Sequence, residues 1–314
     1  MDLKKLKEEL LGLYQVRKTD AQKCAFIDWA TDYARQSEIP VTVEESGGYI
    51  CSRNIVFGDV DKARVILTAH YDTCARMLMP NFSTPGCLPL FVIEQTVLTL
   101  LIVLGGIFTG NAVSAILPAE LHALAAGMVS WSAGFAGAAL VLLLMLAGPA
   151  NPHTANDNTS GVLLVLLAMR RFKEKPGIAY VLFDNEEKGL FGSQAFIKAH
   201  PQAARRCLIN FDCVGDGDTL LYTGMKRAMV MPQAKRLIAA MEEIAPKHGM
   251  KTVSGEFPKW IYPSDQMLFP RGTAFAALKG SRVLYMDRIH TAQDTVLEER
   301  NIRCLLDVLE RSVS

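Results

Sequence analysis

Two long apolar stretches limit what this chain can fold into more than any other feature. Residues 88–108 and 121–148 are almost entirely apolar, and the chain has no lysine or arginine between Met77 and Met169. The charged residues in that interval are Glu94, Glu120 and Asp157. A transmembrane helix needs about 20 predominantly apolar residues, so each stretch is long enough. We expect a two-helix transmembrane hairpin, and a pair of unusually apolar core helices in a soluble domain is the alternative.

Small and charged residues within these stretches refine the expectation. Gly127, Ser130, Gly134 and Gly137 lie in the second stretch, and small residues of this kind let two helices approach closely in lipid. A carboxyl group at the bilayer centre costs about 2.5–3.5 kcal/mol on insertion scales. We therefore expect Glu94 to lie near the membrane interface.

The chain on either side of the hairpin alternates between strand-like and helix-like segments. Apolar runs typical of buried strands occupy residues 63–73, 177–185, 206–214, 219–224 and 282–287, with short strands also expected within 41–57. Helical spacing of apolar residues occurs in residues 1–14, 20–37, 160–172, 192–200, 230–249 and 295–313. The alternation predicts a three-layer α/β/α sandwich with a mixed, largely parallel central sheet. We expect residues 1–84 and 150–314 to form one catalytic domain, with residues 85–149 as the hairpin insert.

Charge and cysteine content narrow the classes of function. Lys and Arg number 33 and Asp and Glu number 32, so the formal net charge of +1 gives no indication of a nucleic-acid partner. The seven cysteines are irregularly spaced without a CxxC pair, which favours reduced thiols over disulfides or a thiolate zinc site. The first 15 residues read as a charged amphipathic helix rather than a signal peptide.

Polar clusters follow several of the predicted strands or open predicted helices. Taken singly, each histidine could be structural and each aspartate could cap a helix. Together they form a set of two histidines and six carboxylates: His70, Asp72, Asp157, Glu186, Glu187, Asp212, His290 and Asp294. Buried carboxylates repel one another, and a divalent metal ion is the usual remedy. Histidine and carboxylate ligands without cysteine suit zinc, and less exclusively manganese or cobalt.

These motifs resemble those of the co-catalytic dizinc aminopeptidases, metallopeptidase family 28, which also includes glutamate carboxypeptidases. His-x-Asp, Asp-Asn-x-Ser-Gly, Glu-Glu-x-Gly-x-x-Gly-Ser, Asn-x-Asp and a late histidine occur in the family's order within residues 20–84 and 150–310. The resemblance implies two divalent metal ions, with Zn²⁺ favoured. His70 and Asp212 would hold one ion, Glu187 and His290 would hold the other, and Asp157 would bridge them.

The resemblance also implies roles for residues that do not hold metal. Glu186 would be the general base that takes a proton from the attacking water. Tyr262 would be an additional hydrogen-bond donor to the developing oxyanion. Asp72 would hydrogen-bond the ring of His70 and fix its tautomer, and Asp294 would act similarly near His290. Gln266 stands where the family commonly has a histidine, but this departure touches no expected ligand.

The expected activity is therefore that of an aminopeptidase acting on a peptide substrate. A carboxypeptidase or an N-acyl amide hydrolase of the same fold is an alternative that keeps the metal chemistry. A single-metal cyclising acyltransferase is another. A catalytically inactive membrane scaffold is the non-enzymatic alternative, although such a protein should lack some of the ligands or the base.

The position of the hairpin predicts a topology. His70 and Asp157 flank the hairpin but belong to one expected site, so the number of membrane crossings must be even. Lysine and arginine are frequent before the first span and absent from residues 109–120. The positive-inside rule then predicts a multi-pass protein of the cell membrane whose catalytic domain faces the cytoplasm. Contact with the lipid bilayer is expected over residues of about 88–148, and the oligomeric state is left open.

Overall fold

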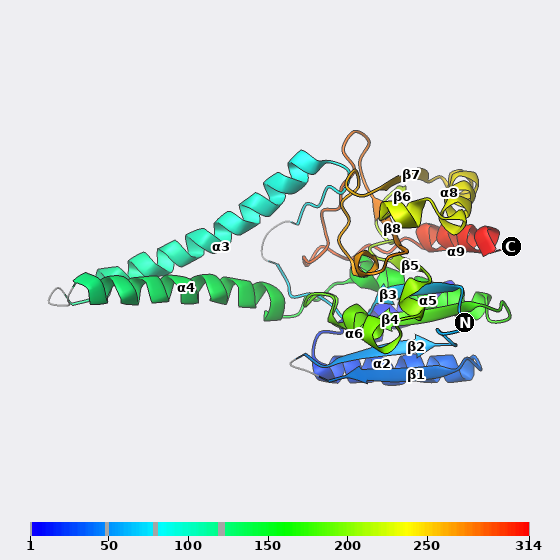
Figure 1. The fold of residues 1–314 in the computed structure, drawn as a ribbon, viewed down its shortest axis with the longest axis horizontal. Coiled ribbons are helices and arrows are strands. Elements are labelled where there is room, and N and C mark those ends of the chain that lie inside the picture. Colours follow the sequence, from blue (N-terminus) through cyan, green and yellow to red (C-terminus); the bar gives the residue numbers. More distant parts are fainter. Residues whose placement is uncertain (1, 48–49, 78–80, 119–122, 314) are drawn as a thin grey trace.

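One mixed sheet organises the chain outside the hairpin. The computed structural model describes residues 2–47, 50–77, 81–118 and 123–313. Its strands follow the spatial order β1-β2-β4-β3-β5-β8-β6-β7 (Figure 1). The strands are β1 (Val41–Ser46), β2 (Ser52–Phe57), β3 (Val65–His70), β4 (Ile178–Phe183), β5 (Cys207–Phe211), β6 (Thr219–Gly224), β7 (Lys251–Glu256) and β8 (Gly272–Leu278).

The central strand pairs are parallel. β3 pairs in parallel with β4 and β5, β5 with β8, and β6 with β7. The remaining pairs, β1 with β2, β2 with β4 and β6 with β8, are antiparallel. The sheet is therefore mixed and largely parallel, as predicted.

Helices cover both faces of this sheet. They are α1 (Leu3–Leu13), α2 (Asp20–Gln36), α5 (Gly161–Arg171), α6 (Phe191–Ala199), α7 (Lys226–Met229), α8 (Pro232–Ile244) and α9 (Glu299–Val313). Short helical turns span Ala155–Ser160, Ala203–Arg205, Ala245–His248 and Asp265–Leu268. Leu67 and Ile209 face the core shared with α1, α2, α5, α8 and α9, whereas Ile66 and Leu208 face a second cluster that contains Phe196 of α6. Because the central strands are buried on both faces, their residues are nearly all apolar, and the α/β sandwich prediction is confirmed.

The prediction of a late strand at residues 282–287 is wrong. Within that segment Tyr285 and Met286 form only isolated bridges, to Lys279 and Ser83. The late strand of the sheet is β8, between β5 and β6, and four of its seven residues, GTAFAAL, are glycine or alanine. Glycine and alanine are depleted in strands, so this segment gave no strand signal on its own. Strand β7 at the sheet edge was also not predicted.

Two apolar helices project from this domain. Figure 1 shows α3 (Leu88–Ile116) and α4 (Ala123–Ala147) extending together away from the sheet, while both chain ends lie on the opposite side. Both are long and apolar enough to cross a membrane, and only 6% of each apolar window is buried. Phe108 and Trp131, for example, are 75% and 74% exposed. Core helices would be mostly buried, so the alternative of an apolar core pair is wrong for the described residues.

The hairpin differs from prediction in length and packs through glycine. Helix α3 continues to Ile116 rather than ending near residue 108, so much of the expected loop over 109–120 is helical. The rest of that loop, from residue 119, and the start of the second stretch lie outside the described residues. A Cβ on Gly106 would lie 2.8 Å from the carbonyl oxygen of Gly134, so a larger residue there would separate the helices.

Candidate metal centre

The expected ligands come from different elements that converge at one edge of the sheet. His70 is the last residue of β3, Glu187 lies shortly after β4, and Asp212 follows β5. These three strands are parallel neighbours, so their carboxyl ends lie side by side. Asp157 comes from the turn that opens α5, and His290 comes from the loop after β8.

Asp157 lies between the two histidines. Its Oδ1 is 3.3 Å from Nε2 of His70, and its Oδ2 is 3.0 Å from Nε2 of His290. Oδ1 of Asp212 is 3.6 Å from Nε2 of His70, and Oε2 of Glu187 is 3.4 Å from Nε2 of His290. The five residues therefore form two adjacent groups that share one carboxylate.

The chemistry of this cluster fits divalent metal ions. His70, Asp157 and Asp212 offer ligand atoms that all lie within 4.8 Å of one another. Oε1 of Glu187 is buried and has no hydrogen-bond partner among the described residues. A buried carboxylate oxygen without a partner is costly, and a cation would satisfy it.

Cys74 is an addition to the second group. Expected only as a reduced thiol, it is buried, and its Sγ lies within 4.8 Å of ligand atoms of Glu187 and His290. The three side chains together can hold a metal ion, since thiolate, carboxylate and imidazole are all zinc ligands. The sequence offered no signal for this, because Cys74 is not part of a metal-binding spacing.

The pKa values of the clustered side chains show that this site favours added positive charge. Burial alone would lower the pKa of His290, but Glu187 and Asp157 raise it to about 10. Burial raises the pKa of Glu187 to about 8, and the charge of Asp157 adds to this effect. Burial likewise raises the pKa of Glu186 well above its ordinary value, with Glu187 contributing. Without metal, the histidines take up protons and the glutamates resist losing theirs.

Asp72 connects the end of β3 to the loop that carries both glutamates. Its Oδ1 accepts the backbone N–H of Glu186 at 3.0 Å, and its Oδ2 accepts that of Glu187 at 3.2 Å. Oδ1 also lies 3.6 Å from Nδ1 of His70. The ring of His70 is instead bonded through Nδ1 to the backbone carbonyl of Asp72 at 3.2 Å, so the expected hydrogen bond from the Asp72 carboxylate is not formed, and that carboxylate holds the two glutamates.

Asp294 holds the backbone around Asp157 rather than the ring of His290. Its two carboxylate oxygens accept the backbone N–H groups of Asn156 at 2.8 Å and Asp157 at 2.9 Å. Burial raises the pKa of Asp294 to about 8. The expectation that Asp294 acts on His290 is replaced by a role in fixing the shared carboxylate.

Tyr262 lies at the same edge of the sheet. Its hydroxyl donates a hydrogen bond to the backbone carbonyl of Asp212 at 3.1 Å, and the residue is buried. Gln266, the departure noted in the sequence, donates to the carbonyl of Tyr262 at 2.7 Å and so holds this loop in place.

Two buried cations beside the site were missed by sequence reasoning. Arg17 is fully buried; its Nη1 donates to the hydroxyl of Thr159 at 3.1 Å, and its Nε donates to the carbonyl of Tyr71. Lys23 is paired with Asp184 in the loop before the glutamates. Arg17 precedes α2 and Lys23 lies within it, far from every ligand in sequence, and neither belongs to a motif.

The base of the hairpin adjoins the metal centre. Ala75 bridges to Ala150, and the backbone N–H of Arg76 donates to the carbonyl of Pro149 at 2.8 Å. The next N–H, that of Met77, donates to the carbonyl of His290 at 2.8 Å. The segment that enters the hairpin is thus bonded both to the segment that leaves it and to the loop that carries His290, one of the expected ligands.

Comparison with known proteins adds to this geometry. A model of peptidase family M28 matches residues 141–303, just over half of the chain. The match includes Asp157, Glu186, Glu187, Asp212 and His290, and it begins after His70. A comparison with curated proteins found no significant match.

Several solved structures share the fold. The LapA aminopeptidase of Legionella pneumophila is 12% identical in sequence. Its match covers 99% of this chain and 68% of the LapA chain, with a TM-score of 0.58. A zinc-dependent exopeptidase of Parabacteroides distasonis is 15% identical, with coverages of 99% and 97% and a TM-score of 0.61. The glutaminyl cyclase of Porphyromonas gingivalis is 15% identical, with coverages of 99% and 96% and a TM-score of 0.61. At these identities the likeness concerns the fold alone.

Proposed function

This chain belongs to peptidase family M28, and we propose that within it the protein is a two-metal aminopeptidase anchored in a membrane. The observation that supports the two-metal assignment is the carboxylate of Asp157, which turns one oxygen toward His70 and the other toward His290. His70 and Asp212 would hold one ion, and Glu187 and His290 would hold the other. A complete set of this kind argues against a scaffold that has lost catalysis.

The proposed mechanism divides the work between metal and protein. When bound, the divalent ions would supply Lewis-acid charge that lowers the pKa of water and polarises the scissile carbonyl. Glu186 would accept the proton of the attacking water and pass it to the nitrogen of the leaving amine. The burial that raises the pKa of Glu186 makes it a stronger base than an exposed glutamate.

Supporting residues would keep Glu186 in place. Its backbone N–H donates to the carboxylate of Asp72, and the backbone carbonyl of the same residue is bonded to Nδ1 of His70, so one residue would orient both the base and a ligand. Tyr262 would donate to the oxyanion only by turning its hydroxyl away from the carbonyl of Asp212, since a hydroxyl has a single proton to give.

Substrate class is the question that an assay must decide. The purified protein would be tested on aminoacyl amides with a free amine and on their N-acetylated counterparts. It would also be tested on N-blocked peptides with a free C-terminal carboxylate and on peptides with an N-terminal glutamine. Cleavage restricted to free-amine substrates is expected. Hydrolysis of blocked substrates would instead favour an N-acyl hydrolase or carboxypeptidase, and cyclisation of N-terminal glutamine would favour a cyclising acyltransferase.

The Glu186→Gln variant tests the base in the same assay. Turnover is expected to fall about 10²–10⁴-fold while metal content stays unchanged. Glu45→Gln, at an exposed position of β1, is the matched control and should behave as wild type. Equal turnover in Glu186→Gln and wild type would remove Glu186 from the mechanism.

We also propose that α3 and α4 anchor the protein in the cell membrane with the domain on the cytoplasmic side. The support is their length, their outward-facing apolar side chains and the lysine and arginine that precede them. Protease treatment of intact and permeabilised cells tests the orientation. Cleavage of the domain only after permeabilisation is expected, and cleavage in intact cells would contradict the cytoplasmic placement.

A further inference from the structure

A second cavity lies at the opposite end of the sheet from the metal centre. It has a volume of about 840 Å³ and is bordered by the starts of β3 and β4, the helix α8 and the end of α9. Val65 lines it, whereas His70 of the metal centre is the last residue of the same strand. Five strand residues span about 16 Å, so the cavity is separate from the catalytic site.

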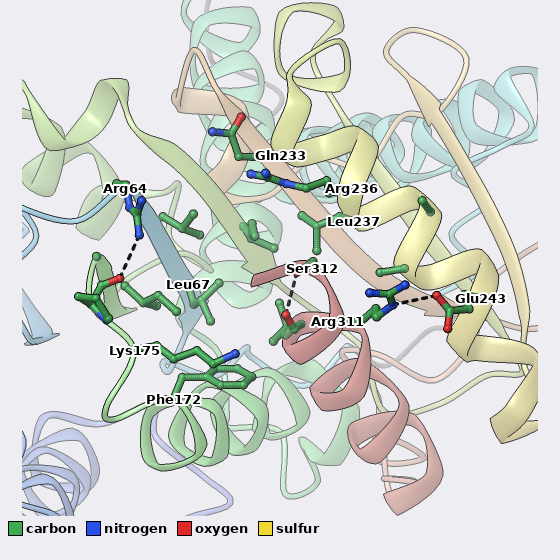
Figure 2. Close-up of a pocket in the computed structure, with 18 residues that line it drawn as sticks. Arg64, Leu67, Phe172, Lys175, Gln233, Arg236, Leu237, Glu243, Arg311 and Ser312 are labelled. Carbon is green, nitrogen blue, oxygen red and sulfur yellow. Dashed lines mark hydrogen bonds and ion pairs between the residues drawn. The ribbon is translucent and has the colours of Figure 1, made fainter. Parts of the chain in front are cut away.

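The cavity has an apolar floor and a cationic rim. Leu67 and Leu237 are among the buried side chains of the floor (Figure 2). Arg64, Lys175, Arg236 and Arg311 approach from different sides, as Figure 2 shows. Among the lining residues the one carboxylate is Glu243, and it is already bonded to Arg311 at 2.9 Å and to Lys247 at 3.2 Å.

Three of the rim cations have no carboxylate partner. Within the part of the chain that the structure describes, Arg64, Lys175 and Arg236 form no ion pair. Nζ of Lys175 lies 5.4 Å from the centre of the Phe172 ring, a contact that holds the amine over apolar surface. All three line the same cavity, so an anion held there would interact favourably with each of them.

Gly177 gives the Arg64 guanidinium its place on the rim. This glycine has φ of +81°, and a Cβ there would lie 2.8 Å from Nε of Arg64. The backbone between Lys175 and β4 therefore adopts a conformation that favours glycine and leaves room for the arginine.

We propose that this cavity binds a small organic anion with an apolar body, such as an aryl or alkyl phosphate or carboxylate. The apolar floor would take the body, and Arg64, Lys175 and Arg236 would take the anionic group. The volume lies within the range of about 300–1,000 Å³ that small-molecule pockets occupy. This assignment does not depend on the proposed peptidase activity.

The ligand would come from solution rather than from the bilayer. Figure 1 shows α8 and α9 on the side of the domain opposite to the projecting hairpin. A cavity between them faces away from the membrane in which α3 and α4 would lie. Anionic lipid headgroups of the same bilayer therefore have no short path to it.

Titration calorimetry with phenyl phosphate tests the proposal on the full chain in phosphatidylcholine nanodiscs. Phenyl phosphate is expected to bind at least about tenfold more tightly than inorganic phosphate or phenol, because each of these lacks one half of the recognised chemistry. Arg236→Gln should weaken phenyl phosphate binding about tenfold or more. Lys235→Gln, an exposed neighbour on α8 that does not line the cavity, should change it less than twofold.

Three results would overturn the proposal. Equal affinity of Arg236→Gln and wild type would place any binding elsewhere, including at the metal centre. Equal affinity for phenol and phenyl phosphate would remove the cationic rim from recognition. A loss of phenyl phosphate affinity when a third of the phosphatidylcholine is replaced by phosphatidylglycerol would identify a lipid headgroup as the ligand, against a ligand from solution. A matching thermal unfolding midpoint for Arg236→Gln and wild type keeps the comparison valid.

Discussion

The carboxylate of Asp72 accepts the backbone N–H of Glu186 at 3.0 Å. Asp72 follows β3 and Glu186 follows β4, so this bond joins the carboxyl ends of two parallel strands. Through this bond Asp72, which is not among the expected metal ligands, fixes the backbone position of the proposed base Glu186. It fixes the neighbouring expected ligand Glu187 in the same way. Asp72 is therefore a positioning residue whose loss should affect both metal affinity and turnover.

The Asp72→Asn variant tests that coupling. The amide keeps one acceptor but sets an NH₂ group against a backbone N–H, so one of the two glutamate contacts is lost. Zinc affinity, measured by chelator competition, should fall about 10–100-fold, and turnover at saturating zinc should also fall. Asp28→Asn, at an exposed position of α2, is the control. Unchanged zinc affinity in Asp72→Asn would mean that these hydrogen bonds do not organise the site.

Metal removal should make stability strongly dependent on pH. Burial raises the pKa of Glu187 and Asp294 to about 8, above the ordinary range of carboxylic acids, and nearby carboxylates raise the pKa of His290 to about 10. At pH values between its ordinary pKa and its raised pKa, each group binds more protons in the folded metal-free chain than in the unfolded chain. Stability of the metal-free protein should therefore fall as pH rises from about 5 to about 9.

Thermal unfolding midpoints across this pH range, with and without zinc, measure the effect. Zinc should remove most of the downward slope, because its charge stabilises the same carboxylates in their ionised form. A metal-free protein whose midpoint rises or stays level from pH 5 to pH 9 would contradict the electrostatic description of the cluster.

Arg17 should contribute to stability although it is distant from every ligand in sequence. Arg17→Met removes the buried donors to the carbonyl of Tyr71 and to the hydroxyl of Thr159, and Thr159 keeps only its 3.4 Å contact with the hydroxyl of Thr154. The free energy of unfolding should fall by about 2–5 kcal/mol, measured by denaturant titration. Arg35→Met on the exposed side of α2 should cost less than about 1 kcal/mol. Equal stability of the two variants would show that the buried guanidinium is dispensable.

The hairpin offers a matched pair of glycine substitutions. Gly106→Leu would drive a side chain into the backbone of Gly134, whereas a Cβ at Gly127 meets nothing within 4 Å. Gly106→Leu should lower the unfolding free energy in detergent by about 1–3 kcal/mol, and Gly127→Leu should leave it nearly unchanged. Equal stability of the two variants would mean that α3 and α4 do not pack as described.

Much of the fold could be predicted because the decisive strands are long apolar runs that end in polar residues. β3, β4 and β5 fall within predicted segments, and their parallel pairing brings His70, Glu187 and Asp212 together. β8 could not be predicted in this way. Most of its residues are glycine or alanine, and its position in the sheet depends on neighbours on both sides that are distant in sequence.

In the site, too, residues within motifs could be predicted, whereas residues brought in by long-range packing could not. Adjacent motif residues predicted that the glutamates and histidines would gather at one edge of the sheet. Arg17, Lys23 and Cys74 have no motif, and they reach the site only through the packing of α2, of the segment before it and of the loop after β3. Asp294 bonds the backbone at Asn156 and Asp157 instead of the expected ring of His290. This contact depends on loop conformation, which residue type and spacing do not determine.

The position and number of bound metal ions test the central claim most directly. Zinc content and anomalous scattering would be measured for crystals of the wild type and of Asp157→Asn. Two ions per chain are predicted in the wild type, one on the His70 side of Asp157 and one on the His290 side, with at least one ion lost in Asp157→Asn. A single ion in the wild type, or two ions with Asp157 bound to neither, would contradict the shared carboxylate and the two-metal mechanism built on it.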